Sequence, residues 1–138
     1  MSKLTPYLLF NGNCKQAMEF YQSCLGGDLA LSKVGDSPAS NYMPPDFAEK
    51  TINAHLTSAN MELSASDWLR PDRAPIAGNT VCVYLNCGSS EELKGYFEKL
   101  SQGADVTDPV KEMFFGMYGA LNDKFGVRWM FSSARAAE

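Results

Sequence analysis

The sequence predicts an α+β fold that consists of two β-α-β-β-β modules, and three observations support this prediction. Runs rich in β-branched and aromatic residues, typical of strands, alternate with two segments whose apolar residues have the spacing of one helical face. Glycine follows each helical segment, as it commonly does at the end of a helix. A shift of 76 positions places Phe20-Tyr21 on Tyr96-Phe97 and Gly27 on Gly103. Chance is the competing explanation, since many α/β chains contain a strand, a helix and a glycine in this order, but we favour an internal duplication.

The first module covers residues 1–68. Its helix is predicted to begin after Asn13, a fair N-cap with Gln16 three residues later, and to end at Gly26-Gly27. The apolar residues between these limits share one helical face: Cys14, Ala17, Met18, Tyr21, Cys24 and Leu25. We expect strands at residues 4–10, 28–35, 51–58 and 60–66, the last two joined by a tight Ala-Asn turn, and a proline-rich loop at 37–50.

The second module covers residues 80–134 and follows a linker at residues 69–79. Ser89 and Glu92 have the spacing of a capping box at the start of its helix, and Gly103 is expected to end that helix. We expect strands at residues 80–87, 104–110, 113–122 and 127–133. The side chains expected to face the helix and the core are Val81, Val83, Leu85, Trp129 and Phe131.

Length, composition and charge limit the classes of protein to which the chain can belong. Its 138 residues, 45% of them hydrophobic, suffice for one folded domain or for two small halves that share a core. A formal net charge of −4 without any run of Lys or Arg argues against a nucleic-acid partner. No apolar run approaches the roughly 20 residues of a membrane helix, and no secretion signal is visible. The four cysteines contain no C-x-x-C pair, so we expect reduced thiols in a cytoplasmic protein without a membrane partner.

Three segments carry a resemblance to a known superfamily: YLLFNGNCKQAMEFYQSCLGG near the start, AHL and MELSASD in the middle, and YGALNDKFGVRWMF at the end. With this order and spacing the chain resembles the vicinal oxygen chelate superfamily, which includes glyoxalase I, the bleomycin and fosfomycin resistance proteins and the extradiol dioxygenases, and within it the PhnB-like branch. The resemblance implies one glyoxalase-like domain over residues 1–138, in which the modules form an open, curved mixed sheet with the helices on its outer face. It also implies a small-molecule ligand on the concave face and a homodimer, but it leaves the reaction open.

Most enzymes of that superfamily hold a divalent metal through ligands on the first, fourth, fifth and eighth strands. Counting from the local motifs places Pro6, Glu62, either Asn79 or Thr80, and Met130 at these four positions. Proline has no side-chain donor, and a thioether is a poor ligand for Ni²⁺, Mg²⁺ or Mn²⁺. Only Glu62 is a plausible ligand, so we expect no cofactor and no metal site of the usual kind, with a divalent metal as the alternative.

Polar and apolar residues alternate along the two strands around His55, the single histidine of the chain. This alternation would turn two sets of side chains towards the concave cavity, namely Asn53, His55 and Thr57 on one strand and Glu62, Ser64 and Ser66 on the next. We take His55 and Glu62 as candidate catalytic residues, able to move a proton next to a carbonyl or enol group. A partly hydrated, hydrogen-bonded His55 without chemistry is the alternative.

Seven further residues are candidates for ligand binding: Asn53, Ser64, Asp67, Trp68, Tyr84, Tyr118 and Arg128. Arg128 is a candidate anion anchor, because a guanidinium group binds carboxylate or phosphate with a fork of donors, and a solvated charge is its alternative. For Asp67 a role in a turn or a cap is the interpretation that we favour, and for Trp68 packing between the modules.

The sequence leaves several functions open. The chain is expected to bind a small molecule, either as a metal-independent enzyme of unknown substrate or as a protein that sequesters a drug or metabolite without catalysis. A metal-dependent lyase, isomerase or dioxygenase with an atypical site, and a structural protein with a filled cavity, are the remaining candidates. Relatives in the PhnB-like branch are sometimes labelled demethylubiquinone methyltransferases. The sequence, however, contains no Gly-rich loop between a strand and a helix that would hold S-adenosylmethionine.

Overall fold

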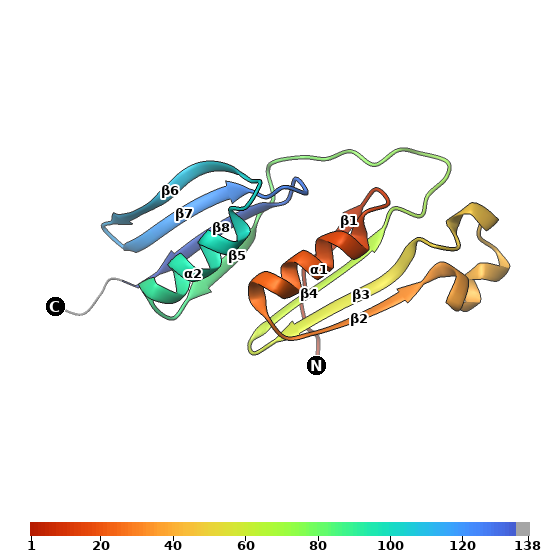
Figure 1. The fold of residues 1–138 in the computed structure, drawn as a ribbon, viewed down its shortest axis with the longest axis horizontal. Helices are drawn as coiled ribbons and strands as arrows, with labels where there is room; N and C mark the ends of the chain where they lie inside the picture. The colour runs from red at the N-terminus through yellow and green to blue at the C-terminus, as the bar shows by residue number, and fades with distance from the viewer. Residues whose placement is uncertain (135–138) are drawn as a thin grey trace. The chain divides into compact units, whose positions relative to one another are not determined.

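The computed structural model describes residues 1–134 of the chain and confirms the predicted α+β fold. The chain divides into two compact units, unit one from Met1 to Ile76 and unit two from Ala77 onward. Each unit contains one four-stranded sheet with a helix along one face, as Figure 1 shows. The segment between the last strand of unit one and the first strand of unit two contains no helix or strand.

Unit one has a mixed sheet with the strand order β1-β4-β3-β2. Its elements are β1 (Tyr7–Phe10), α1 (Cys14–Leu25), β2 (Asp28–Lys33), β3 (Thr51–Ser58) and β4 (Met61–Asp67). β1 pairs in parallel with β4, whereas β3 pairs in antiparallel fashion with both β2 and β4. The predicted loop at residues 37–50 contains two short 3-10 helices, at Pro38–Asn41 and Pro45–Phe47, after a third at Val34–Asp36.

Unit two repeats this arrangement with the strand order β5-β8-β7-β6. Its elements are β5 (Val83–Cys87), α2 (Ser90–Leu100), β6 (Asp105–Met113), β7 (Gly116–Asn122) and β8 (Arg128–Ser133). The first and last strands of the unit again pair in parallel, and the other pairs are antiparallel. Because both units share element order, strand order and strand direction, the structure confirms the β-α-β-β-β repeat.

Several predicted boundaries were wrong at the strand ends. The strands expected from residues 4, 80 and 113 begin three residues later, at Tyr7, Val83 and Gly116. β1 begins after Pro6, which has no N–H to donate to the sheet, although its partner β4 extends further, to Met61. β5 begins near the start of its single partner, β8, at the pair Val83–Trp129. Val81 therefore lies outside β5 and is 85% exposed, although we expected it to face the helix.

The two helices begin with different caps. In α2 the prediction holds, because the Ser89 hydroxyl accepts a hydrogen bond from the Glu92 N–H at 3.1 Å. In α1 Asn13 occupies the predicted N-cap position, but its side chain does not make the expected capping hydrogen bond. Instead the N–H of Cys14 donates to Asp67 Oδ1 at 2.9 Å, so a carboxylate from the end of β4 caps α1. A carboxylate at a helix N-terminus also interacts favourably with the helix dipole.

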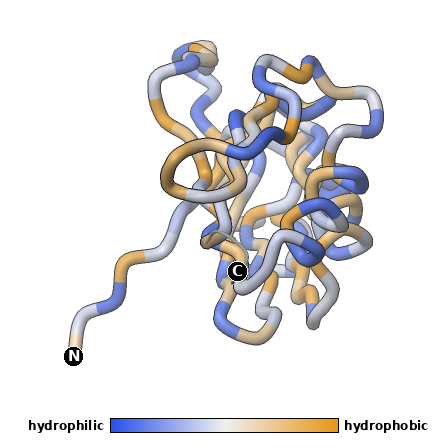
Figure 2. The backbone as a smooth tube through the Cα atoms, turned by 90° about the vertical axis from the view of Figure 1, so that its left-hand side faces the viewer, coloured by the Kyte–Doolittle hydropathy of each residue, from blue (hydrophilic) through white to orange (hydrophobic). Residues whose placement is uncertain are grey.

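Each core lies between a helix and one face of its sheet. In unit one Ala54, Leu56, Leu63 and Ala65 point towards α1 and are at most 4% exposed. In unit two Trp129 and Phe131 are buried, as predicted, and they are the largest fully buried side chains of that unit. Figure 2 shows that hydrophobic and hydrophilic stretches alternate along the backbone. Among the described residues, no helix is long and apolar enough to cross a membrane.

Candidate functional site

Both sheets leave one face uncovered by their own helix, and we call it the open face of the unit. In unit one, buried and more exposed residues alternate along β3, so Asn53, His55 and Thr57 lie on the open face, as expected. The strand register places Ser64 directly opposite His55 and Glu62 directly opposite Thr57. Three of the predicted site residues, His55, Glu62 and Ser64, are therefore brought together.

These residues form a hydrogen-bonded chain that crosses two strands. His55 Nδ1 lies 2.8 Å from Ser64 Oγ, and His55 Nε2 lies 3.3 Å from Glu62 Oε1. The second carboxylate oxygen of Glu62 forms an ion pair with the Lys3 ammonium group. The side chains of His55 and Glu62 are 40% and 24% exposed, so a ligand can reach this series of polar contacts.

The charge on Glu62 fixes the direction of these hydrogen bonds. Hydrogen bonding to Lys3 lowers the pKa of the Glu62 carboxyl, and the hydrogen bond with His55 acts in the same direction. An ionised carboxylate only accepts hydrogen bonds, so of the two neutral tautomers of His55 it favours the one that carries its proton on Nε2. His55 Nδ1 is then an acceptor, and the Ser64 hydroxyl donates to it. The arrangement can accept a proton at Nδ1 and stabilise the resulting imidazolium through Glu62.

Sequence reasoning missed three contributions to this face. Tyr7 and Leu9 on β1 lie opposite Ser64 and Ser66, and they are 51% and 54% exposed. The alternation of LTPYLLF contained this signal, but it became readable only once the parallel pairing of β1 with β4 was known. Nothing in the sequence indicated that Lys3 would contact Glu62.

Asp67 and Trp68 have partners within unit one that explain their positions. The two carboxylate oxygens of Asp67 accept hydrogen bonds from the N–H groups of Cys14, at 2.9 Å, and Thr51, at 2.8 Å. Asp67 is 2% exposed, so it joins the start of α1 to the start of β3 as a buried structural residue. The indole N–H of Trp68 donates to the carbonyl oxygen of Arg73 at 2.8 Å.

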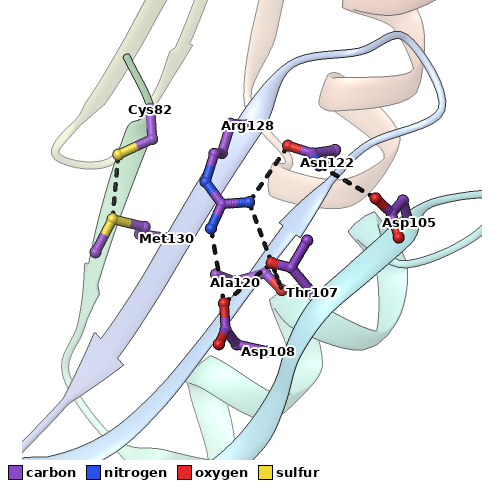
Figure 3. A network of polar contacts seen from close by, with 8 residues as sticks. All are labelled: Cys82, Asp105, Thr107, Asp108, Ala120, Asn122, Arg128 and Met130. Atoms are coloured by element: carbon purple, nitrogen blue, oxygen red, sulfur yellow. Dashed lines mark hydrogen bonds and ion pairs between the residues drawn. The ribbon is translucent and has the colours of Figure 1, made fainter. Parts of the chain in front are cut away.

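In unit two, Arg128 is the centre of a polar network that Figure 3 shows. Its Nη1 donates to Thr107 Oγ1 at 3.1 Å and to Asn122 Oδ1 at 3.3 Å, and its Nη2 lies 3.6 Å from Asp108 Oδ2. Asn122 in turn donates to Asp105 Oδ2 at 3.3 Å. The guanidinium group is therefore not a freely solvated charge, and an anionic ligand has to compete with Asp108 for it.

Two further pairs of residues lie on the open face of unit two. Cys82 Sγ donates to Met130 Sδ at 3.1 Å (Figure 3), and Tyr84, 57% exposed, shares a hydrogen bond with Ser132. Tyr118 is half-buried on β7 and packs edge-to-face against Phe115 with the ring centroids 6.1 Å apart. The structure thus places Tyr84 and Tyr118 in unit two and the His55 chain in unit one.

Cys82 is partly exposed, whereas the other three cysteines are buried. Burial raises the pKa of the Cys14 thiol to about 12 and that of the Cys87 thiol to about 11, with the negative charge of Asp67 and of Glu92 adding to the respective shifts. Buried thiols of this kind are inert, because the thiolate is the reactive form.

The residues at the metal positions of the superfamily do not suit a hard divalent ion. Pro6 offers no side-chain donor, Glu62 is already bound by Lys3 and His55, and the Met130 thioether accepts from Cys82. Over residues 1–134, no three His, Cys, Asp or Glu side chains are grouped as metal ligands.

The two strand-to-helix connections also lack a loop of the kind that binds S-adenosylmethionine. The connection before α1 contains one glycine, Gly12, and the first N–H of the helix is already bound by Asp67. The connection before α2 contains Gly88, and the Ser89 hydroxyl caps the helix. Neither connection is the Gly-rich turn with a free helix N-terminus that binds such cofactors.

Comparisons with known proteins agree with this architecture. A family model described as 3-demethylubiquinone-9 3-methyltransferase matches residues 2–132. The chain is 31% identical over 140 aligned positions to Protein YjdN of Escherichia coli (strain K12), covering 94% of this chain and 93% of that protein. Protein PA1353 from Pseudomonas aeruginosa superposes with a TM-score of 0.88 at 33% identity, covering 99% of this chain and 100% of that one.

Two other solved structures share this fold. A putative 3-demethylubiquinone-9 3-methyltransferase, PhnB protein, from Bacillus cereus has a TM-score of 0.73 and 26% identity, with 96% of this chain and 100% of that chain covered. A glyoxylase/bleomycin resistance protein/dioxygenase domain from Frankia sp. EAN1pec shares the fold, with a TM-score of 0.67, 16% identity and coverage of 98% and 99%. The chain therefore belongs to the PhnB-like family described as 3-demethylubiquinone-9 3-methyltransferase, and it shares its fold with the glyoxylase/bleomycin resistance protein/dioxygenase domain.

Proposed function

We propose that the chain binds a small molecule on the open face of unit one, with His55 as the central contact. The observation that carries this proposal is the chain Lys3–Glu62–His55–Ser64, which lies on a sheet face and keeps its histidine 40% exposed. These contacts would add little to the stability of the fold, because exposed ion pairs contribute about 0–1 kcal/mol to the free energy of unfolding. Asn53, exposed on the same strand, adds a polar group that can orient the ligand.

The chemistry that this geometry supports is proton transfer without a metal. With Nε2 held by the Glu62 carboxylate, Nδ1 can take a proton from a ligand that displaces the Ser64 hydroxyl, and Glu62 then stabilises the imidazolium. A ligand with an acidic proton next to a carbonyl or enol group fits this role. The residues argue against methyl transfer from S-adenosylmethionine, because neither strand-to-helix connection offers a loop for it.

Sequestration of a ligand without catalysis is the second candidate function, and exposed aromatic side chains favour it. Tyr7 is 51% and Tyr84 is 57% exposed, each on the open face of its own unit. Aromatic faces of this kind suit flat ligands, because they offer large apolar area together with a polar edge.

A homodimer, implied by the family resemblance, remains part of the proposal, and light scattering of the purified chain tests it.

A ligand screen on the full chain tests the proposal. Native mass spectrometry looks first for a co-purified small molecule, and a thermal-shift screen then covers enolisable carbonyl compounds, aromatic acids and antibiotics. A ligand at 100 times its Kd should stabilise the protein by about 2.7 kcal/mol. Hits should stabilise the wild type and the control Ser32→Ala, which lies exposed on β2 opposite Asn53, but not His55→Asn. Hits that stabilise all three proteins equally would contradict the proposed site.

A further inference from the structure

The three side chains on the open face of unit one have the mutual geometry of a nucleophile, a base and an orienting carboxylate. The hydroxyl of Ser64 lies 2.8 Å from one imidazole nitrogen of His55, and the other nitrogen lies 3.3 Å from Glu62. Such constellations are recognised by geometry and roles rather than by order in the sequence. We propose that Ser64 is a nucleophile, activated by His55, that attacks esters of small acids. This inference rests on the proposed function only in using the same face.

The direction of the hydrogen bonds supports this assignment. The Glu62 carboxylate, whose pKa the Lys3 ammonium lowers, accepts the proton-bearing Nε2, so Nδ1 presents its lone pair to the Ser64 hydroxyl. The nitrogens are exchanged relative to the usual serine hydrolase arrangement, in which the carboxylate holds Nδ1. The roles are unchanged, because either nitrogen can act as the base once the other is held as a donor.

Ser64 is distinguished from the other serines of this face by its partner and its exposure. Ser66, two residues further along β4, is 5% exposed and its hydroxyl donates to the Asp67 carbonyl oxygen. Ser32 on β2 is exposed, but it lies opposite Asn53 rather than opposite a base. Ser64 is half-buried, so a ligand that contacts His55 also reaches its hydroxyl.

The reaction balances without any further reagent. The bond between Ser64 Oγ and the acyl carbon forms while the hydroxyl proton passes to His55 Nδ1, and the ester C–O bond breaks as that proton passes to the leaving alcohol. Water then attacks the acyl-serine, gives one proton to Nδ1, and releases the acid as that proton returns to Ser64 Oγ. The net change is the hydrolysis of an ester to an acid and an alcohol.

The surroundings of Ser64 narrow the class of ester. Its own N–H donates to the Pro6 carbonyl oxygen at 3.1 Å, so this group cannot stabilise an oxyanion. A substrate with a good leaving group needs less stabilisation of this kind, which favours aryl over alkyl esters. Tyr7 lies opposite Ser64 on β1, half-exposed, and offers an aromatic surface for the aryl group.

Covalent labelling of the full chain tests the assignment. The protein is incubated with p-nitrophenyl acetate or a fluorophosphonate probe, and the modified residue is located by peptide mass mapping. We expect one label per chain, on Ser64, in the wild type and in the control Ser32→Ala. Ser64→Ala should lose it, and His55→Asn should slow it about 100-fold or more, the usual contribution of a general base. Circular dichroism verifies that each variant is folded.

Three outcomes overturn the assignment: a label on another residue, no label on the folded wild type, or equal labelling rates in the wild type and His55→Asn. Glu62 is a positioning residue, so Glu62→Gln should lower the maximal rate of labelling and leave the probe concentration at half-maximal rate unchanged. The ligand screen separates this inference from the proposed function. If ligands bind in a way that depends on His55 but Ser64 is not labelled, only the assignment of Ser64 as a nucleophile is rejected. If no ligand binds and Ser64 is not labelled, the proposed function is rejected as well.

Discussion

Replacing Asp67 should destabilise unit one severely, because this carboxylate satisfies two backbone donors at once. Asp67→Ala leaves the N–H groups of Cys14 and Thr51 without the acceptors that now lie 2.9 and 2.8 Å away. A buried donor that loses its partner costs about 1–3 kcal/mol, so the variant should lose about 2–6 kcal/mol. Asp67→Asn keeps one acceptor oxygen and should lose about half as much. The free energy of unfolding of a small protein is only about 5–15 kcal/mol, so the alanine variant approaches the limit at which the protein still folds.

Urea unfolding followed by circular dichroism measures these losses, with Asp46→Ala as the control. Asp46 is an exposed aspartate of the loop before β3, and its replacement should change the free energy of unfolding by less than about 0.5 kcal/mol. A loss below about 1 kcal/mol for Asp67→Ala would refute the structural role of the carboxylate, as would a loss equal to that of the control.

Three further predictions concern the ion pair, the repeat and the thiols. Lys3→Met should raise the pKa of Glu62 towards its ordinary value, because Lys3 is the main cause of the lowering; a carboxyl ¹³C titration checks this, and an unchanged pKa would contradict the ion pair. Gly27→Ala should destabilise the protein more than Gly103→Ala, since both have positive φ but only at Gly27 would a Cβ meet a backbone oxygen, at 2.2 Å; equal melting temperatures would argue against it. Under native conditions a thiol reagent should modify Cys82 and leave the three buried cysteines unreacted until urea is added, and fast reaction of more than one thiol would contradict the burial.

The fold was predictable because its signals are local. The helical spacing, the alternation along β3 and the glycine after α1 each depend on residues close in sequence. The same alternation placed His55 and Glu62 on one face before their contact was known. The strand ends were not predictable in this way, since β1 stops where its pairing with β4 stops.

The parts of the site that the sequence could not predict depend on contacts between distant residues. The hydrogen bond from Cys14 to Asp67 joins residues 53 positions apart, and it replaced the local cap that Asn13 was expected to provide. The ion pair of Lys3 with Glu62 likewise depends on where the segment before β1 lies. Pattern reasoning therefore found the polar residues of the open face but not the partners that set their charge.

The nitrogen spectrum of the imidazole tests the central claim most directly. His55 is the single histidine of the chain, so its long-range ¹H–¹⁵N signals need no assignment by mutation. We predict that the neutral ring carries its proton on Nε2, that Ser64→Ala changes the Nδ1 signal, and that a ligand which stabilises the protein shifts both nitrogens. A proton on Nδ1, together with signals that no stabilising ligand moves, would contradict the account of His55 as the centre of the site.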